Sequence, residues 1–483
     1  MLHRAPMFEA LAEHSRAGGR AFHVPGHKQR ASFSHEEAAV YYDSIAALDV
    51  TELPDTDDLH HPIGSLLEAQ QLAADCYGTD ETRFLVGGST AGNLAMILGQ
   101  CEPGDLVIVQ RNVHKSVIHG LMLAGARAVL LSPEIDPISG LGLLPHPERL
   151  DRALEQYPEA RGVILTNPNY YGMTGDLAPL VRLVHERSIP VMVDEAHGPH
   201  FGFHPRFPSS ALRSGADVVI HSAHKMLSAM TMGAMIHMQG DLLDRESIRQ
   251  ALRMVQSSSP SFPILASLDL ARRQLQVEGA EAFSQALRAL DTVLDKLAET
   301  PFRNLGAGKY RNKAVAYDPL KLVLFDETGM LDGFSLRDEL GKRGCVAEMA
   351  DSRYVVLAFG TGSIPEDGDA LIQALFDIAG SFKITTVRAS KVRSEEYRLS
   401  EEIPAPIVFR RKMPPSEAIP LEESAGRIAA EWVIPYPPGI PVLFPGEEIQ
   451  PSAVNQLIQW RAKGAQIQGA EDSSLCRVRV LEK

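Results

Sequence analysis

The stretch DVVIHSAHK (217–225) is the second of two similar segments, and the first is PVMVDEAHG (190–198). Each begins with an apolar run rich in β-branched residues and ends in polar and charged side chains. The same kind of apolar run recurs in DLVIVQ (105–110), AVLL (128–131), GVILT (162–166) and GAMIHM (233–238). Amphipathic stretches such as 115–124 and 177–187 lie between these runs, a pattern typical of a parallel sheet with helices on both faces. The sequence therefore predicts an α/β fold with a mostly parallel sheet.

The remaining sequence predicts further parts around this region. Helical sequence dominates from residue 245 to about 300, and residues 310–380 have the pattern of a smaller α+β unit. A polar segment and a proline-rich stretch then lead to a helix that we expect at 422–434. We therefore expect four parts: an N-terminal segment (1–60), a large domain (61–300), a small α+β domain (301–385) and a C-terminal domain (386–483).

Composition and charge exclude several classes of protein. Of the 483 residues 45% are hydrophobic and 22% are charged, as in ordinary globular proteins, and no window is apolar enough to span a membrane. The N-terminus has no signal-peptide pattern, and the four cysteines have no CxxC or zinc spacing. We therefore expect a cytoplasmic protein without a metal site. The formal net charge of −14 argues against nucleic acid or an anionic membrane as partner and is compatible with a cationic substrate.

The segment VGGSTAGN (86–93) has the residues of a phosphate-binding turn. Two glycines let a ligand approach the backbone closely, and Ser89 and Thr90 lie where a helix is expected to begin. A helix N-terminus with free N–H groups and hydroxyls binds phosphate. The alternative is a glycine-rich turn in which a Ser or Thr side chain caps the helix.

Asp194 and Lys225 each follow an apolar strand. A buried aspartate at a strand end needs a partner, and the protonated pyridine nitrogen of pyridoxal phosphate (PLP) would be one. The alternatives for Asp194 are a metal ligand or a helix cap. Lys225, beside Ser222 and His224, would be a Schiff-base nucleophile if it were buried near a pyridinium. The alternative for Lys225 is a surface lysine.

The order of these sites resembles that of the fold-type I PLP enzymes. The phosphate turn comes first, then Asp194, and Lys225 follows Asp194 by 31 residues. The resemblance implies that Lys225 holds PLP as a Schiff base. In fold-type I decarboxylases a histidine from the loop that here contains His114 stacks on the cofactor ring. The alternative for His114 is a loop histidine that caps a helix.

Longer segments resemble the bacterial ornithine/lysine/arginine decarboxylases, in the short form without the N-terminal wing domain. The similar segments are FHVPGHK (22–28), DVTELPDTDDLHHP (49–62), GGSTAGN (87–93), RNVHKS (111–116), TNPNYYG (166–172), VDEAHG (193–198), HSAHK (221–225) and YPPGIPVLFPGE (436–447). The short form is similar to arginine decarboxylases that make agmatine, a step of polyamine biosynthesis. Lysine and ornithine are the alternative substrates.

The resemblance implies a role for each matching residue. Ser89, Thr90, Ser222 and His224 would bind the phosphate, and Asp194 would pair with the pyridine nitrogen. Ala196 and His197 would line the side of the ring opposite His114, although larger relatives tend to have an aromatic residue at the position of His197. Protonation of the product would come from Lys225 or His224. Members of the family form homodimers or multiples of dimers with active sites at the subunit interface, so we expect the same here.

A basic substrate needs an acidic partner. Glu447, which follows the proline-rich segment YPPGIP (436–441), is the first candidate for this partner, and Glu448 and Asp55 are the next candidates. The alternative for Glu447 is a solvated surface glutamate. Transamination or aldol cleavage are the rival PLP reactions, with Arg353 as the arginine that an aminotransferase would need. A catalytically silent homologue is a further alternative. The His224–Lys225 pair and YPPGIP favour decarboxylation.

Overall fold

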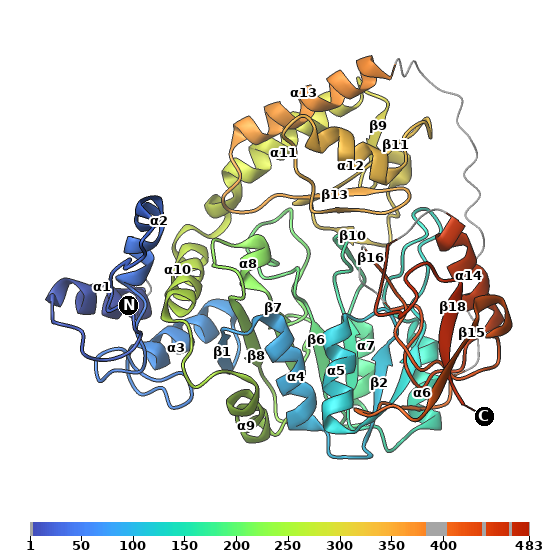
Figure 1. Cartoon of the computed structure of the whole chain (residues 1–483), viewed down its shortest axis with the longest axis horizontal. Coiled ribbons are helices and arrows are strands. Elements are labelled where there is room, and N and C mark those ends of the chain that lie inside the picture. Colours follow the sequence, from blue (N-terminus) through green and yellow to red (C-terminus); the bar gives the residue numbers. More distant parts are fainter. Residues whose placement is uncertain (1–2, 383–402, 437–440, 463–465, 483) are drawn as a thin grey trace. The chain divides into compact units, whose positions relative to one another are not determined.

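The computed structural model describes residues 3–382, 403–436, 441–462 and 466–482 (Figure 1). The chain divides into two compact units. Unit 1 comprises Met1–Gln100, Pro190–Ser284 and Gly360–Gly362. Unit 2 comprises Cys101–Ile189, Gln285–Phe359 and Ser363–Lys483. Both contain strands and helices, and the predicted α/β fold is confirmed.

Four strands of unit 1 lie in the order β1 (Glu81–Leu85), β8 (Ala234–Met238), β7 (Val218–His221) and β6 (Val191–Asp194). β6 and β7 are parallel, with Asp194 opposite Ile220, whereas β8 is antiparallel to both β7 and β1. Every residue of β6, β7 and β8 is buried, which explains why their sequences are apolar nearly throughout. The carboxyl ends of β6 and β7 therefore meet at one edge of the sheet.

Helix α4 (Gly88–Gln100) packs closely against these strands because glycines face its neighbours. A Cβ atom at Gly92 would lie within 3.0 Å of side-chain atoms of Leu85 and Ile220. A Cβ atom at Gly99 would lie 2.6 Å from the Cα atom of Ile248 in α9 (Arg245–Val255). The close packing places the first turn of α4 beside the ends of β1 and β7.

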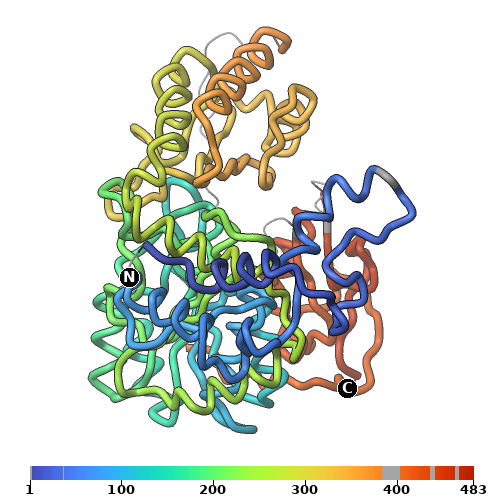
Figure 2. The backbone as a smooth tube through the Cα atoms, turned by 90° about the vertical axis from the view of Figure 1, so that its left-hand side faces the viewer, coloured from blue at the N-terminus to red at the C-terminus, as the bar shows by residue number. Residues whose placement is uncertain are grey.

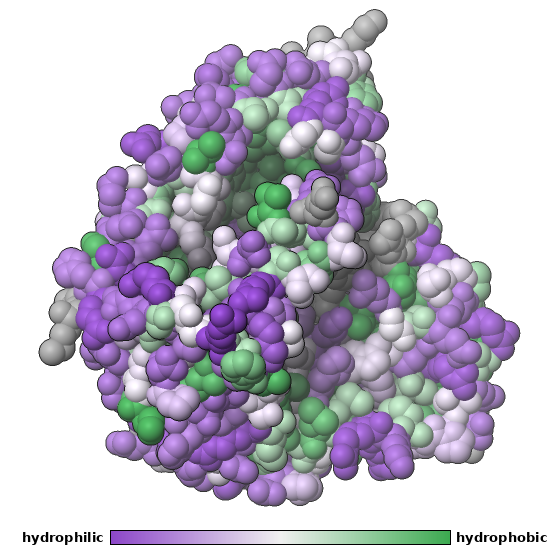
Figure 3. All heavy atoms as spheres, turned by 60° about the vertical axis from the view of Figure 1, so that its left-hand side comes forward, coloured by the Kyte–Doolittle hydropathy of each residue, from purple (hydrophilic) through white to green (hydrophobic). Residues whose placement is uncertain are grey.

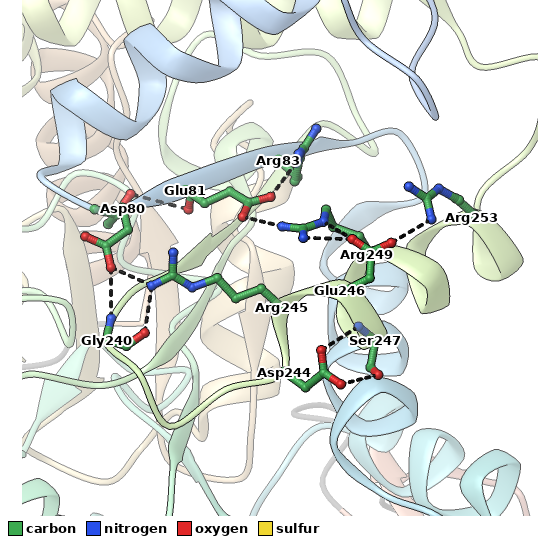
Figure 4. A network of polar contacts seen from close by, with 11 residues as sticks. Asp80, Glu81, Arg83, Gly240, Asp244, Arg245, Glu246, Ser247, Arg249 and Arg253 are labelled. Carbon is green, nitrogen blue, oxygen red and sulfur yellow. Dashed lines mark hydrogen bonds and ion pairs between the residues drawn. The ribbon is translucent and has the colours of Figure 1, made fainter.

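An ion-pair network joins β1 to α9 (Figure 4). Glu81 pairs with Arg83 at 2.7 Å and with Arg249 at 2.8 Å, and Arg249 also pairs with Glu246. A single exposed ion pair contributes at most about 1 kcal/mol to the free energy of unfolding. The network therefore holds β1 and α9 together by linking several such pairs. Just past α9, the side chain of Gln256 accepts a hydrogen bond from the backbone N–H of Val86 at 2.9 Å. The turn from β1 into α4 is thus held from two sides.

The N-terminal helices of unit 1 are α1 (Pro6–Ala17), α2 (Glu36–Ala46) and α3 (Ser65–Tyr77). Figure 2 shows α1 alongside α10 (Phe262–Glu278), and the backbone N–H of Met7 donates to Asp269 of α10 at 2.9 Å. Asp269 also forms a fully buried ion pair with Arg272. The short helices α8 (Ala223–Met226) and η1 (Gly279–Phe283) complete unit 1.

The surface is mostly hydrophilic, with separate hydrophobic side chains, as one face of it shows (Figure 3). Several of the exposed large apolar side chains lie between residues 22 and 63: Phe22, Val24, Phe33, Val40, Tyr41, Tyr42, Ile45 and Ile63. Two of them, Phe33 and Tyr42, contact each other edge to face, with their ring centroids 5.3 Å apart. No helix in the described part of the chain is both long and apolar enough to cross a bilayer.

Unit 2 has its own four neighbouring strands, in the order β4 (Val163–Thr166), β2 (Leu106–Gln110), β3 (Arg127–Leu131) and β14 (Ile407–Val408). β2 is parallel to β3 and β4, and β14 is antiparallel to β3. The helices that follow strands in this part are α5 (Lys115–Ala124), α6 (Pro147–Gln156) and α7 (Ala178–His185). The alternation of strand and helix agrees with the expectation from the sequence.

A smaller α+β part of unit 2 contains the antiparallel strands β12 (Met349–Ala350), β13 (Val355–Ala358), β11 (Lys321–Asp326) and β9 (Phe302–Asn304). Its helices are α11 (Ser284–Leu297), α12 (Gly333–Gly341) and α13 (Pro365–Ser381). The short strand β5 (Met173–Thr174) pairs with β10 (Ala316–Tyr317) and so joins this part to the preceding one. The short 3₁₀ turn η2 (Gly308–Tyr310) lies between β9 and β11 in sequence. The expected strands and helices of this region are present.

The C-terminal part of unit 2 is the place where the sequence-based expectation was wrong. Residues 422–434 were expected to be a helix, but only η3 (Leu421–Glu423) is helical there. Gly426 has a positive φ of 77°, and the backbone N–H groups of Ala429 and Ala430 donate to Glu447 and Arg479 rather than to a preceding turn. Pairing with distant segments therefore overrides the helix-like spacing of the apolar residues.

The other elements of this part form a small mixed layer. They are β15 (Ser416–Pro420) paired with β18 (Arg477–Leu481), β16 (Ile434–Tyr436) paired with β17 (Gln466–Gln468), and α14 (Pro451–Ala462). A cluster that includes Leu421, Val433, Leu457 and Val480 forms their core. Of the YPPGIP segment, residues 437–440 lie outside the described residues.

Candidate active site

Asp194 lies at the end of β6 and is 4% exposed. Its Oδ2 atom accepts a hydrogen bond from Asn93 Nδ2 of α4 at 2.9 Å, and its Oδ1 atom accepts one from the backbone N–H of Ala196 at 3.1 Å. Two neutral donors hold the carboxylate in place but do not balance its charge. A buried carboxylate of this kind suits a cationic partner. Asn93 is part of the quoted GGSTAGN motif, but its contact with Asp194 spans 101 residues and has no local signal.

Lys225 belongs to the short helix α8, directly after β7. Its Nζ atom lies 3.0 Å from His197 Nε2, and His197 is 7% exposed. The backbone N–H of Ser222 donates to the carbonyl of Ala196 at 3.3 Å. The structure thus brings together the two strand ends that the sequence singled out, with the lysine amine beside the imidazole.

His224 is oriented by the backbone. Its Nδ1 atom lies 2.9 Å from the carbonyl oxygen of Gly233, so Nδ1 carries the hydrogen and donates it. Burial lowers the pKa of His224, a hydrogen bond to Gly233 opposes this, and the charge of Lys225 lowers it further. Nε2 is then the ring nitrogen left for a ligand: it is an acceptor in the neutral imidazole and a donor, as a phosphate oxygen needs, in the protonated one.

The predicted phosphate ligands surround the start of α4 and of α8. Ser89 and Thr90 lie in the first turn of α4, after Gly88, whose φ is +71°. A Cβ atom at Gly87 would lie 3.0 Å from that of Ala91, so the turn leaves little room for a side chain there. Ser222 Oγ is buried and has no hydrogen-bond partner within the described ranges. Because a buried hydroxyl without a partner is costly, this atom fits a ligand acceptor such as a phosphate oxygen.

His114, in unit 2, is the N-cap of α5. Its Nδ1 atom accepts from the backbone N–H of Ser116 at 3.2 Å and lies 2.8 Å from Ser116 Oγ. The helix-capping alternative thus describes its local geometry, and the imidazole is exposed. Capping uses only one edge of the ring, so stacking of its face on a cofactor stays a prediction.

Glu447, the residue expected to meet the substrate cation, is already paired. Both of its carboxylate oxygens accept hydrogen bonds from Arg111, one of them at 2.9 Å. Arg111 also donates to the carbonyl of Val442 at 3.0 Å and lies over the ring of Phe444 at 5.2 Å. The pair spans 336 residues, and nothing local in the sequence indicated it. A role for Glu447 in substrate binding therefore requires Arg111 to share or release it.

Two of the remaining candidates, Asp55 and Arg353, also have partners. Asp55 lies 2.8 Å from His14 Nδ1, and this hydrogen bond lowers the pKa of Asp55. The guanidinium of Arg353 lies 4.9 Å from the ring centroid of Tyr354 and 5.4 Å from that of Phe325. Glu448 is exposed. In the part of the chain that the structure describes, no group of three or more His, Cys, Asp or Glu residues is arranged to hold a metal ion.

Comparison with known proteins shows the family. The Orn/Lys/Arg decarboxylase major domain matches residues 5–302, and the C-terminal domain of the same family matches residues 408–466. The chain is 34% identical over 486 residues to an arginine decarboxylase of Bacillus subtilis (strain 168), covering 100% of this chain and 98% of the relative. It is 39% identical over 466 residues to the uncharacterized protein YaaO of the same bacterium, covering 96% of each.

Solved structures share the fold. Lysine decarboxylase A from Pseudomonas aeruginosa has a TM-score of 0.79 at 20% identity, covering 99% of this chain and 80% of that one. A serine palmitoyltransferase with PLP has a TM-score of 0.51 at 19% identity, covering 66% of this chain and 77% of that one. The buried Ser222 hydroxyl, the turn at Gly87 and the strand-end Asp194 fit this cofactor. The chain belongs to the Orn/Lys/Arg decarboxylase family and is a PLP-dependent decarboxylase.

Proposed function

We propose that this enzyme decarboxylates a basic L-amino acid, with arginine as the preferred substrate and agmatine and CO₂ as products. The arginine decarboxylase of Bacillus subtilis is similar to this chain over its full length, which supports arginine as the substrate. The net charge of −14 favours a cationic substrate. Lysine or ornithine is the alternative, and the lysine decarboxylase LdcA of Pseudomonas aeruginosa, 26% identical over 553 residues, supports lysine.

The juxtaposition of Lys225, His197 and Asp194 in unit 1 carries this proposal. Lys225 would attach the cofactor through its side-chain amine, and Asp194 would hold the pyridine nitrogen in its protonated form. Ser89, Thr90, Ser222 and His224 would hold the phosphate, while His114 and the pair Ala196–His197 would line the ring. When bound, PLP supplies an electron sink for the pair left behind when the Cα–carboxylate bond breaks.

The protein's own groups handle the protons. Once CO₂ has left, a proton must be delivered to Cα, and the Lys225 amine or the His224 imidazole delivers it. His197 Nε2, 3.0 Å from Lys225 Nζ, is placed to exchange a proton with that amine. A neutral His224 needs to be protonated before it can donate, so Lys225 is the more direct donor.

A carboxylate would bind the cationic side chain of the substrate, and Glu447 is the first candidate for it. A charge-assisted pair contributes roughly 1.5–3 kcal/mol. The guanidinium of Arg111 against Glu447 is itself a cation of the kind that the substrate would present. An arginine substrate would therefore compete with or displace Arg111.

We further propose that the enzyme is cytoplasmic, that it acts in polyamine biosynthesis, and that it assembles as a homodimer or a multiple of dimers. The exposed apolar side chains between residues 22 and 63 support a covered surface in unit 1. We also propose, from the pattern of the sequence, that the chain has four parts, at residues 1–60, 61–300, 301–385 and 386–483.

Product analysis tests the reaction and its substrate together. The purified enzyme with PLP is incubated separately with arginine, lysine, ornithine and diaminopimelate, and both CO₂ and the organic product are measured. We expect CO₂ and the amine in equal amounts, with the highest kcat/KM for arginine. A keto acid as main product would indicate transamination. A best substrate with a neutral or acidic side chain would overturn the proposal.

A further inference from the structure

Four buried side chains of unit 1 form a hydrogen-bonded row across the sheet, one from each strand or strand end. Thr82 Oγ1 in β1 lies 2.8 Å from His237 Nδ1 in β8. His237 Nε2 lies 3.0 Å from His221 Nδ1 in β7. His221 Nε2 lies 2.8 Å from Oε2 of Glu195, the residue after β6. None of the four is more than 2% exposed, and we call them the buried row.

The buried row lies on the face of the sheet opposite the candidate cofactor site. Ile220 packs beneath Gly92 of α4, and Asp194 bonds to Asn93 of the same helix. Side chains alternate between faces along a strand, so His221 points away from α4, and Glu195, which bonds to it, does the same. Two members of the buried row, Glu195 and His221, are therefore neighbours of Asp194 and Ser222 along the chain. Their side chains would not contact a cofactor bound on the α4 side.

The ring nitrogens determine where the hydrogens lie. If Glu195 is protonated, its hydroxyl donates to His221, His221 Nδ1–H donates to His237, and His237 Nδ1–H donates to Thr82. Thr82 then donates to Thr79 Oγ1, which lies 3.1 Å away. If Glu195 is ionised, every one of these bonds reverses. The two states differ by one proton, and each uses all four imidazole nitrogens.

The surroundings favour the protonated state. Glu195 is surrounded by Ser210, Ala211, His221, Tyr77 and His200, and the charge of His200 lowers the pKa of Glu195. Burial raises the pKa of Glu195 to about 8, although hydrogen bonds from Ser210 and Ala211 lower it. Burial also lowers the pKa of His221 to about 3 and that of His237 well below its usual range. At neutral pH all members of the row are then uncharged.

We propose that the buried row is a positioning device in which Glu195 keeps a proton, so that the strand ends of β6 and β7 are joined by neutral hydrogen bonds and no second negative charge lies beside Asp194. A second anion there would add its own field to that of Asp194 at the pyridine nitrogen, so a neutral row lets Asp194 set that field. The row also fixes His221, which precedes the Ser222–Lys225 segment. The second half of this inference rests on the proposed role of Asp194.

Infrared spectroscopy tests the protonation directly. A difference spectrum between the wild-type holoenzyme and Glu195→Gln at pH 6.5 should contain the carbonyl band of a protonated carboxylic acid that the variant lacks. Gln fits the protonated state because its amide N–H₂ donates to His221 and its oxygen accepts from Ala211. A missing acid band, or a carboxylate band in its place, overturns the proposal.

Thermal stability tests it independently. The pKa of Glu195 is about 8 in the folded protein, whereas its ordinary value, expected in the unfolded protein, is 4.5. The protonated side chain therefore contributes to the stability of the folded protein fully below pH 4.5, and this contribution is lost as the pH rises through about 8. The glutamine side chain of the Glu195→Gln variant does not titrate. The Tm of this variant relative to wild type should therefore rise between pH 5 and 8.5. A difference that stays constant or falls contradicts a proton on Glu195.

His221→Gln and His221→Phe test the positioning. Gln is a neutral donor and acceptor and should retain most of the PLP affinity, whereas Phe should weaken it about tenfold or more by releasing Glu195. Tyr77→Phe is the matched control, because the Tyr77 ring packs on both imidazoles at 5.2 and 4.5 Å but its hydroxyl bonds to Pro199 outside the row. Equal PLP affinity in all three variants would overturn the positioning role. If the Phe variant fails to fold, a Gln variant that binds PLP much more weakly than the Tyr77 control overturns it instead.

The absorbance of bound PLP separates this inference from the proposed function. Titrated with pH, Glu195→Gln should show the same midpoint as wild type, since no charge is removed. A midpoint that moves downward indicates that an anion was removed and overturns the neutral row. If instead Asp194→Asn leaves the spectrum and rate unchanged, the proposed role of Asp194 is wrong, while the infrared and stability results on the buried row still stand.

Discussion

Lys225 Nζ and His197 Nε2 lie 3.0 Å apart, and the imidazole has little exposed surface. The amine that is proposed to bond to the cofactor therefore has an imidazole nitrogen within hydrogen-bonding distance. His197 combines a flat ring with a nitrogen that reaches the lysine.

Replacing His197 separates these two properties. His197→Phe keeps a flat ring but has no Nε2, and it should bind PLP with nearly unchanged affinity while kcat falls about a hundredfold, the lower range of general acid–base effects. His197→Ala should lose affinity as well as rate. PLP titration and steady-state kinetics measure both, and a wild-type kcat in the Phe variant would show that Nε2 has no part in the reaction.

Asp194 and Asn93 should give graded effects. Asp194→Asn retains the shape but not the charge, and we expect a loss of about a thousandfold or more in rate with the fold intact by circular dichroism. Asn93→Ala removes one hydrogen bond to that carboxylate, which is worth roughly 1.5–3 kcal/mol, so a loss of about tenfold or more is expected. If the Asn93 variant is as impaired as the Asp194 variant, the amide does more than orient the carboxylate.

His114 allows its two proposed roles to be tested one at a time. His114→Ser retains a side chain that caps α5, whereas His114→Phe retains a flat ring but loses the cap, worth about 1 kcal/mol. If the ring stacks on the cofactor, the Phe variant should bind PLP better than the Ser variant although it is less stable to heat. PLP occupancy and turnover at wild-type levels in the Ser variant would leave His114 as a helix cap only.

Glu447 and Arg111 call for a double-mutant cycle. If Glu447 meets the substrate cation, Glu447→Gln should raise KM for a basic amino acid about tenfold or more, with the absorbance of bound PLP unchanged. If its task is to bind Arg111, then Glu447→Gln, Arg111→Gln and the double variant should have similar Tm values below that of wild type, and KM should not respond. Kinetics and melting of the three variants distinguish these outcomes.

Much of the fold was predictable because it depends on local patterns. The apolar runs at 190–194 and 217–221 became β6 and β7, since residues buried on both faces of a sheet must be apolar nearly throughout. The helix expected at 422–434 failed because its apolar spacing resembles a helix, while Gly426 and pairing with Glu447 and Arg479 favour an extended chain. Tertiary pairing of this kind leaves no mark within a short window of sequence.

The candidate site was predictable to a similar extent. Asp194 and Lys225 were singled out because each follows an apolar strand, and the structure places both at the ends of neighbouring strands. The contacts Asn93–Asp194, Arg111–Glu447 and Thr82–His237 join residues 101, 336 and 155 positions apart, so sequence spacing could not reveal them. His221 and His237 looked like ordinary members of apolar strands, and only their mutual distance shows that they form a row.

The most direct test of the account is the site of cofactor attachment. The PLP-loaded enzyme is reduced with borohydride, digested, and its peptides are mapped by mass spectrometry, once alone and once after incubation with arginine. The account predicts that the pyridoxyl group is found on Lys225 in the first sample and that arginine protects Lys225 from labelling in the second. A label on another lysine, for example Lys115, would contradict the assignment of the active site.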